Sequence, residues 1–68
     1  MSEQEFIQFH GEDVNITLKS GNTIKGFCCA FTRAADNDSG IPSLSIEAEN
    51  GLYEVMLDEV KDIKIITP

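Results

Sequence analysis

Residues 14–19 read Val-Asn-Ile-Thr-Leu-Lys, and the turn sequence Ser-Gly-Asn at 20–22 leads from them into a second apolar stretch. The alternation of apolar and polar residues is typical of a half-buried antiparallel strand, so we predict a strand over 12–19. Its core face consists of Val14, Ile16 and Leu18.

The second stretch, over 22–32, is apolar on both faces and carries Gly26 near its middle. A glycine inside a strand weakens pairing unless the strand bends sharply or another backbone approaches closely. We therefore predict that this strand curls at Gly26 from one sheet of a small, strongly bent antiparallel barrel into the other.

The N-terminus predicts a short helix. Ser2 and Glu5 match the capping-box pattern, which places a helix over 3–9. So brief a helix is marginal alone, and we expect it to lie on the barrel. The side chains that it should bury are Phe6 and either Ile7 or Phe9.

A loop over 33–42 is the longest irregular stretch, and three strands follow it, over 43–48, 52–57 and 61–66. Asn50-Gly51 joins the first two as a tight turn, because both residue types tolerate positive φ. One turn over 58–60 precedes the last strand. The chain is thus predicted to be a single domain over 1–68, an all-β, five-stranded SH3-like barrel with a short N-terminal helix.

The length and the terminal composition bound the class of protein. A domain of 68 residues buries only about 60% of its unfolded surface, so we expect self-association to add stability. No apolar run approaches the roughly 18 residues of a membrane span, and the acidic N-terminus is unlike a signal peptide. We expect a cytoplasmic protein.

Little in the sequence supports metal or covalent chemistry. Cys28 and Cys29 are adjacent, so in a strand they point to opposite faces and join no distant segments. His10, the single histidine, does not complete a four-ligand zinc site with them. The loop over 36–40 departs from the calcium-binding spacing, because glycine stands at its fifth position. We expect free thiols, no metal, no cofactor and no enzymatic activity.

The balance of charge is acidic. Five basic and twelve acidic residues give a formal net charge of −7 and a pI near 4.3. Because affinity for nucleic acid depends mainly on Lys and Arg, this balance counts against such a partner. An oligomer can still gather a few lysines on one face. Glu47, Glu49 and Glu54 are expected to form a solvated acidic face.

The pattern resembles the Sm and Sm-like family, including its Hfq type. The residues that carry the resemblance are the apolar positions of 14–18, Gly21, Ile24, Gly26 and the closing stretch 63–68. The resemblance implies an SH3-like barrel. It also implies rings, in which strand four of one subunit pairs with strand five of the next, and RNA binding around the pore.

The RNA-contacting motifs of the family differ here. Thr32 stands nearest to the position where the family has Asp, and Glu-Val-Lys-Asp at 59–62 replaces the Hfq-type Tyr-Lys-His-Ala. We therefore predict a non-enzymatic binding or scaffold module that self-associates and engages a protein partner. The alternative is an Sm-like RNA-binding protein, whose contacts would be Lys19, Lys25, Arg33, Lys61 and Lys64.

Two apolar surfaces predict the protein interface. One is the outer face of the strand over 22–32, which needs cover from either the helix or a neighbouring subunit. The other is the strand over 52–57, because an edge strand that is apolar on both faces is an aggregation hazard. The predicted interface residues are Phe27, Cys29, Phe31, Tyr53, Val55 and Leu57.

Overall fold

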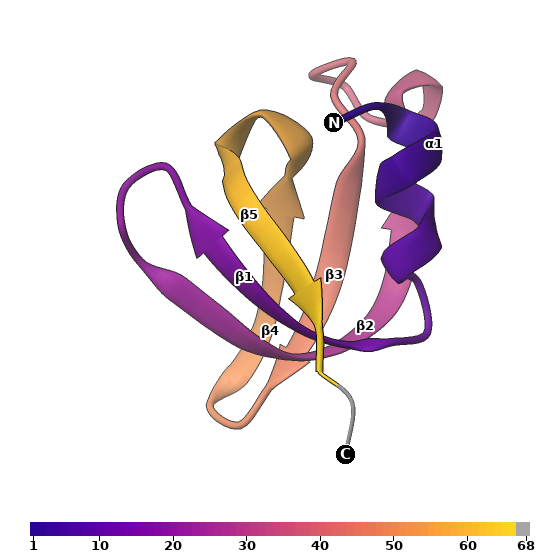
Figure 1. Ribbon diagram of the computed structural model, residues 1–68. Helices are drawn as coiled ribbons and strands as arrows, with labels where there is room; N and C mark the ends of the chain where they lie inside the picture. Colours follow the sequence, from indigo (N-terminus) through magenta and orange to yellow (C-terminus); the bar gives the residue numbers. More distant parts are fainter. Residues whose placement is uncertain (67–68) are drawn as a thin grey trace.

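The chain forms one five-stranded antiparallel sheet with the strand order β4-β3-β2-β1-β5, in a computed structural model that describes residues 1–66 (Figure 1). Its elements are α1 (Glu3–Phe6), η1 (Ile7–Phe9), β1 (Asp13–Leu18), β2 (Thr23–Thr32), η2 (Ala34–Asp36), β3 (Ser43–Ala48), β4 (Gly51–Met56), η3 (Leu57–Glu59) and β5 (Val60–Ile65). The η elements are single 3₁₀ turns. This arrangement confirms the predicted all-β fold with a short N-terminal helix. Thr67 and Pro68, which end the stretch used for the family resemblance, lie outside the described residues.

The strand β2 belongs to both layers of the bent sheet. Its residues 23–27 pair with β1, whereas residues 26–32 pair with β3, so the two ladders overlap at Gly26 and Phe27. Figure 1 shows β2 curving from the β1–β2 turn toward the side where α1 lies. A Cβ atom at Gly26 would fall on the carbonyl oxygen of Glu47. The predicted curl of β2 at Gly26 is confirmed, and the close approach of the two backbones is the reason that glycine is required there.

The sheet bends strongly but does not close. β4 pairs with β3 and β5 pairs with β1, and no ladder joins β4 to β5 within residues 1–66. The predicted barrel is therefore an open sheet folded over one core. Two of its strands, β4 and β5, are edges.

The core lies between the two layers of the sheet and against α1. It consists of Phe6, Val14, Ile16, Cys28, Leu44, Ile46, Val55 and Ile63. Leu18, the third residue predicted for the core face of β1, is half-buried. Ile65 lies opposite Val14, on the core side of the sheet, but is 44% exposed because β5 is an edge strand.

The predicted capping box begins the helix. The Ser2 hydroxyl accepts the Glu5 N–H at 3.2 Å, and the Ser2 N–H donates to the Glu5 carboxylate at 3.1 Å. The hydrogen bond from the Ser2 backbone lowers the pKa of Glu5. Gly11 follows the helical turns with φ of 84°, a left-handed conformation that glycine adopts readily at the end of a helix. No helix in residues 1–66 is long and apolar enough to cross a membrane.

One side of the helical segment packs on the sheet. Phe6 is fully buried, and its ring meets Phe31 edge to face with centroids 6.3 Å apart. Phe9 is half-buried and contacts the core, whereas Ile7 is 45% exposed. Of the two predicted companions of Phe6, Phe9 is the buried one.

The hairpin of β3 and β4 forms as predicted, with its turn one residue earlier. Ala48 pairs with Gly51, so Glu49 and Asn50 are the turn residues. Positive φ occurs at Gly51, with 144°, and not at Asn50. The conformational freedom of glycine is therefore used at the first residue of β4.

The loop over 33–42 is more ordered than its composition predicts. The Asn37 amide donates to the Ile41 carbonyl at 2.7 Å and to the Ser43 hydroxyl at 3.1 Å. The buried Ser43 hydroxyl donates in turn to the Glu54 carboxylate at 3.1 Å. This chain of hydrogen bonds holds the loop against β3 and β4.

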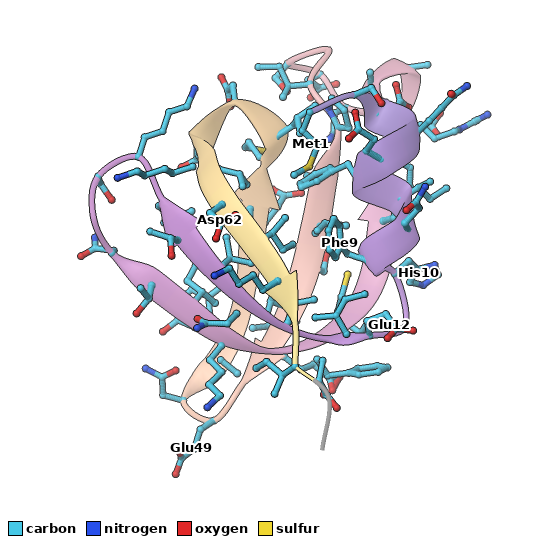
Figure 2. All side chains as sticks on the ribbon, viewed as in Figure 1. Met1, Phe9, His10, Glu12, Glu49 and Asp62 are labelled. Atoms are coloured by element: carbon cyan, nitrogen blue, oxygen red, sulfur yellow. The ribbon has the colours of Figure 1, made fainter. Side chains whose placement is uncertain are left out.

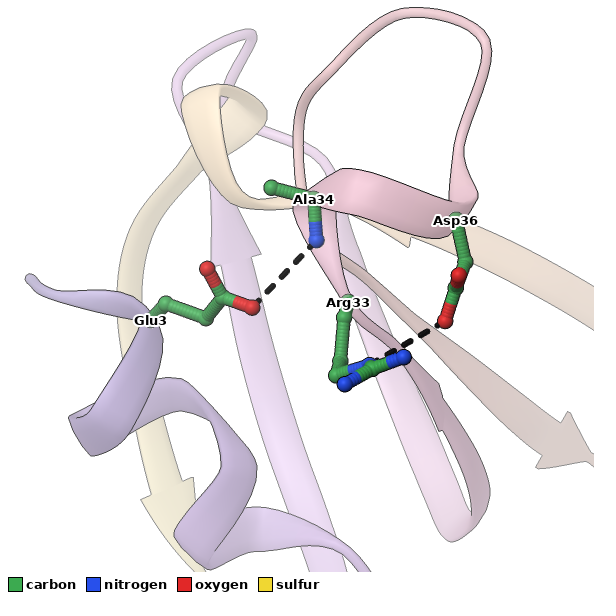
Figure 3. Close-up of polar contacts among 4 residues, drawn as sticks. All are labelled: Glu3, Arg33, Ala34 and Asp36. Carbon is green, nitrogen blue, oxygen red and sulfur yellow. Dashed lines mark hydrogen bonds and ion pairs between the residues drawn. The ribbon is translucent and has the colours of Figure 1, made fainter.

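The loop is also tied to the N-terminal helix (Figure 3). The Glu3 carboxylate accepts the N–H of Ala34 at 3.3 Å. Beside it, Arg33 forms a 3.1 Å ion pair with Asp36, and both side chains are largely exposed. An exposed ion pair of this kind contributes little to stability. The hydrogen bond from the Ala34 N–H to Glu3 is therefore the contact that links the loop to the helix.

We expect Gly26→Val to destabilise the fold by about 2–3 kcal/mol, because the added side chain forces β2 away from β3. Urea unfolding followed by circular dichroism measures the free energy of unfolding. Thr23→Val, at an exposed position of the same strand, is the control and should stay within about 0.5 kcal/mol of the wild type. A Gly26→Val variant as stable as the wild type would contradict the close approach.

Candidate interaction surface

A β-bulge decides which side of β2 each apolar residue faces. Cys28 pairs with Ile46, and the ladder with β3 resumes at Ala30, so Cys29 is an extra residue. One extra residue reverses the alternation of side chains along the strand. Phe31 therefore turns toward the core side.

The predicted apolar face of Phe27, Cys29 and Phe31 is consequently wrong as a single surface. Phe31 is half-buried against Phe6, so the N-terminal helix supplies its cover. Cys29 is half-buried, with its thiol 3.5 Å from the carbonyl of Ser45. Phe27 alone stays on the outer side of the sheet, 40% exposed.

The predicted interface residues near β4 also separate. Val55 lies opposite Leu44 and is only 2% exposed, so it belongs to the core of the single chain. Leu57 follows the strand in η3 and packs against the same core. Tyr53 faces the core side nearer the turn and keeps 37% of its surface exposed. Leu52, on the outer side, is 67% exposed, the most of any large apolar side chain in residues 1–66.

The backbone of β4 presents a free edge. The Met56 N–H donates to the Glu59 carboxylate at 3.2 Å and so points away from β3. In an antiparallel ladder every second residue has this orientation, which directs the backbone groups of Leu52 and Glu54 outward as well. Within the described chain no strand covers them. Glu59 closes this edge at its C-terminal end.

A cavity of about 480 Å³ lies beside the free edge. It opens between the start of β2 and the β3–β4 turn. Its lining consists of Thr23, Ile24, Lys25, Ala48, Glu49, Asn50 and Tyr53. Tyr53 belongs both to β4 and to the lining, so the cavity is adjacent to the edge.

The second free edge is β5. Its apolar residue Ile65 is 44% exposed. Lys64 lies on the outer side, 3.9 Å from the Asp62 carboxylate, and both of these side chains are more than half exposed. β5 thus presents an apolar side and a partly basic side to a neighbour.

Two of the predicted RNA-contact residues share one row on the outer face. Lys25 on β2 and Lys64 on β5 both lie opposite Asn15 on β1. Side chains that are paired across strands point to the same side of the sheet. The sheet therefore brings these two lysines to either side of one asparagine.

The other three basic residues lie elsewhere. Lys19 and Lys61 follow Leu18 and Val60, which pair with each other in an antiparallel ladder, so the two lysines lie on opposite sides of that pair. The Lys19 N–H donates to the Glu59 carbonyl at 2.9 Å. Arg33 lies beside α1, where it is engaged in its ion pair. The five predicted RNA contacts therefore do not form a single patch.

Negative charge is concentrated in one part of the chain. Residues 34–60 contain seven acidic residues and no lysine or arginine, whereas the rest contains five acidic and five basic residues. The net charge of −7 thus comes entirely from β3, β4 and their adjoining segments. Figure 2 shows Glu49 extending into solvent from the β3–β4 turn. This division is visible in the sequence once charge is counted along the chain rather than as a total.

The titratable and sulfur-containing residues offer little chemistry. Within residues 1–66 no three His, Cys, Asp or Glu side chains gather to hold a metal ion. Cys28 and Cys29 are free thiols, and burial raises the pKa of Cys28, which disfavours its reactive thiolate. Figure 2 shows His10 directed away from the sheet. The surface therefore offers mainly backbone groups, apolar side chains and carboxylates.

The fold is similar to that of a solved structure from Vibrio cholerae O395, YaeO bound to magnesium. The similarity has a TM-score of 0.70 at 17% sequence identity and covers 85% of this chain and 71% of the other. At this identity the likeness concerns the fold alone. No protein-family model and no curated protein sequence matches the chain.

Two lysine substitutions in β4 test how this strand divides its residues. Val55→Lys should unfold the chain, because it places an unpaired charge in the core. Leu52→Lys, on the exposed outer side, should leave the chain folded. At a protein concentration where both proteins are single chains, its free energy of unfolding should stay within about 0.5 kcal/mol of the wild type. Circular dichroism and urea unfolding measure both variants. A folded Val55→Lys protein would show that this side chain lies outside the core.

Proposed function

We propose that the protein is a non-enzymatic binding or scaffold module, a divergent member of the Sm-like family, that self-associates and engages a protein partner. The support for the family is the resemblance of the sequence together with the five-stranded order of the sheet. The support for a binding role is the surface of the molecule. It presents unpaired strand backbone, exposed apolar side chains and carboxylates.

The observation that carries this proposal is the pair of free edges on one small sheet. Proteins usually protect such edges with several charges, proline, a bulge or a covering segment. In β4, Gly51–Met56, the single charged residue is Glu54, and Leu52 and Tyr53 are exposed beside it. An edge with so little protection is suited to pairing with another strand.

A second copy of the chain offers a matching strand. Pairing β4 of one copy with β5 of another would satisfy both edges. On the outer side of the sheet, this contact places Glu54 of one copy and Lys64 of the other on the same face. On the inner side, it places Tyr53 and Ile65 on the same face. A head-to-tail contact of this kind closes into a ring when its rotation permits.

We do not propose that this chain binds magnesium, the ion bound in the similar structure. A magnesium site needs carboxylate or other oxygen ligands arranged around one point. Among the described residues no three His, Cys, Asp or Glu side chains gather at one point.

Size-exclusion chromatography with light scattering tests the assembly. At tens of micromolar the wild type should have a mass several times the 7.5 kDa of one chain. Leu52→Lys should reduce it toward a single chain, because it places a charge on the β4 edge. Gln8→Lys, an exposed substitution with the same change in charge, should not. A single-chain mass for the wild type would refute self-association.

RNA binding is the alternative function, and the row of Lys25, Asn15 and Lys64 is the observation that favours it. Two lysines on one outer row provide phosphate contacts, and asparagine provides a hydrogen-bonding group between them. The net charge of −7 opposes this function. We therefore rank it second.

Titration with single-stranded RNA at two salt concentrations separates the two functions. The leading proposal predicts that the protein shows no salt-dependent affinity for RNA. Binding that weakens with salt and is reduced by Lys25→Gln with Lys64→Gln would instead establish the alternative, because each lost phosphate contact lowers the salt slope by about 1. Arg33→Gln, far from the row and already paired with Asp36, is the control.

A further inference from the structure

The β4 edge is the free edge that lies within the acidic part of the chain. Its own Glu54, Glu47 on the adjacent strand and Glu49 in the turn surround it with carboxylates. We propose that this edge docks an extended, basic segment of another protein as an added strand. The inference rests on the proposed function, since it takes the β4 edge as a contact surface, and it specifies the chemistry of the protein partner.

Backbone groups provide the first part of the recognition. The N–H and C=O groups of Leu52 and Glu54 point outward, and the hydrogen bond from Met56 to Glu59 marks the end of the usable edge. The site is therefore short. An incoming strand forms main-chain hydrogen bonds with these two residues, and such bonds supply affinity independently of sequence.

The inner side of the edge selects an apolar residue. The side chain of an added strand that points toward the core side meets the exposed part of Tyr53. Next to Tyr53 lies the cavity of about 480 Å³, where Ile24 and Ala48 supply apolar wall. Alternate side chains of an added strand enter such pockets and provide specificity. An aliphatic or aromatic residue therefore suits this position.

The outer side selects a basic residue. Side chains of the added strand that point outward lie beside Glu54, which is exposed although it accepts a hydrogen bond from Ser43. Glu47 lies one strand further in, on the same side of the sheet. Opposite charges directly across strands stabilise pairing. A partner strand with Lys or Arg at alternate positions complements this side.

Net charge favours another protein over a second copy at this edge. Two copies each carry a formal charge of −7 and repel one another, whereas a basic segment is attracted. Added salt therefore strengthens self-association, because it screens the repulsion between copies, and weakens binding of the basic segment, because it screens their attraction. The basic segment and the β5 strand of a second copy compete for the same backbone groups.

A labelled peptide in which Lys alternates with Ile and Val is the probe, and the same peptide with Glu in place of Lys is its control. Fluorescence anisotropy measures affinity at low and at high salt. Amide NMR spectra report whether the signals of Leu52 and Glu54 respond. If the wild type is assembled, Ile65→Lys, which alters the β5 side of the contact and leaves β4 unchanged, provides single chains for the titration.

Charge-matched variants separate docking at the edge from general attraction. Glu47→Lys with Glu49→Lys should weaken binding of the basic peptide about tenfold, because both carboxylates are near the edge. Glu12→Lys with Asp62→Lys changes the net charge equally but at exposed positions on other segments, as Figure 2 shows. This control should weaken binding less than about threefold.

The inference is supported if the basic peptide binds, the acidic peptide does not, added salt weakens binding, and the amide signals of Leu52 and Glu54 shift. It is overturned if the basic peptide does not bind to folded single chains, or if both pairs of variants weaken binding equally. Self-association is judged separately by the mass of the wild type. If the wild type is assembled and single chains of Ile65→Lys ignore the peptide, only this inference is refuted. If the wild type is a single chain and binds the peptide, only self-association is refuted.

Discussion

The close contact between the backbones of β2 and β3 at Gly26 is the constraint on which the rest of the structure depends. Gly26 is paired with β1 on one side and with β3 on the other, and the Glu47 carbonyl occupies the place of a side chain. Because β2 bends there, its two halves serve two layers that enclose one core. Without this contact a chain of 68 residues has no second layer with which to cover Val14 and Ile16.

The same bend accounts for the free edges. The sheet folds over itself through one long strand, β2, and β4 and β5 stand at the two ends of the strand order. Their inner residues Val55 and Ile63 still reach the core, so both strands are held firmly in the single chain. Their outer backbone groups remain available. Stability of the domain and readiness to pair with another strand therefore arise from one arrangement.

Binding surfaces on this fold depend on small local departures from regularity. The bulge at Cys29 moves Phe31 under the N-terminal helix and removes it from the outer face. The carboxylate of Glu59 covers the backbone of Met56 and limits the length of the open edge. Charge then distinguishes the two edges, since β4 lies among acidic residues whereas β5 carries Lys61 and Lys64.

Elements with local signals could be predicted from the amino-acid sequence. These include the capping box of Ser2 and Glu5, the alternation of β1 and the bend of β2 at Gly26, because each depends on residues adjacent in the chain or on a missing side chain. The burial of Val55 and the exposure of Tyr53, in contrast, follow from the packing of the folded chain. Both residues lie on the same side of β4, and their burial depends on which residues of other strands lie across from them. The side that Phe31 faces was likewise decided by the pairing of β2 with β3, since a bulge is a property of two strands and cannot be found in one.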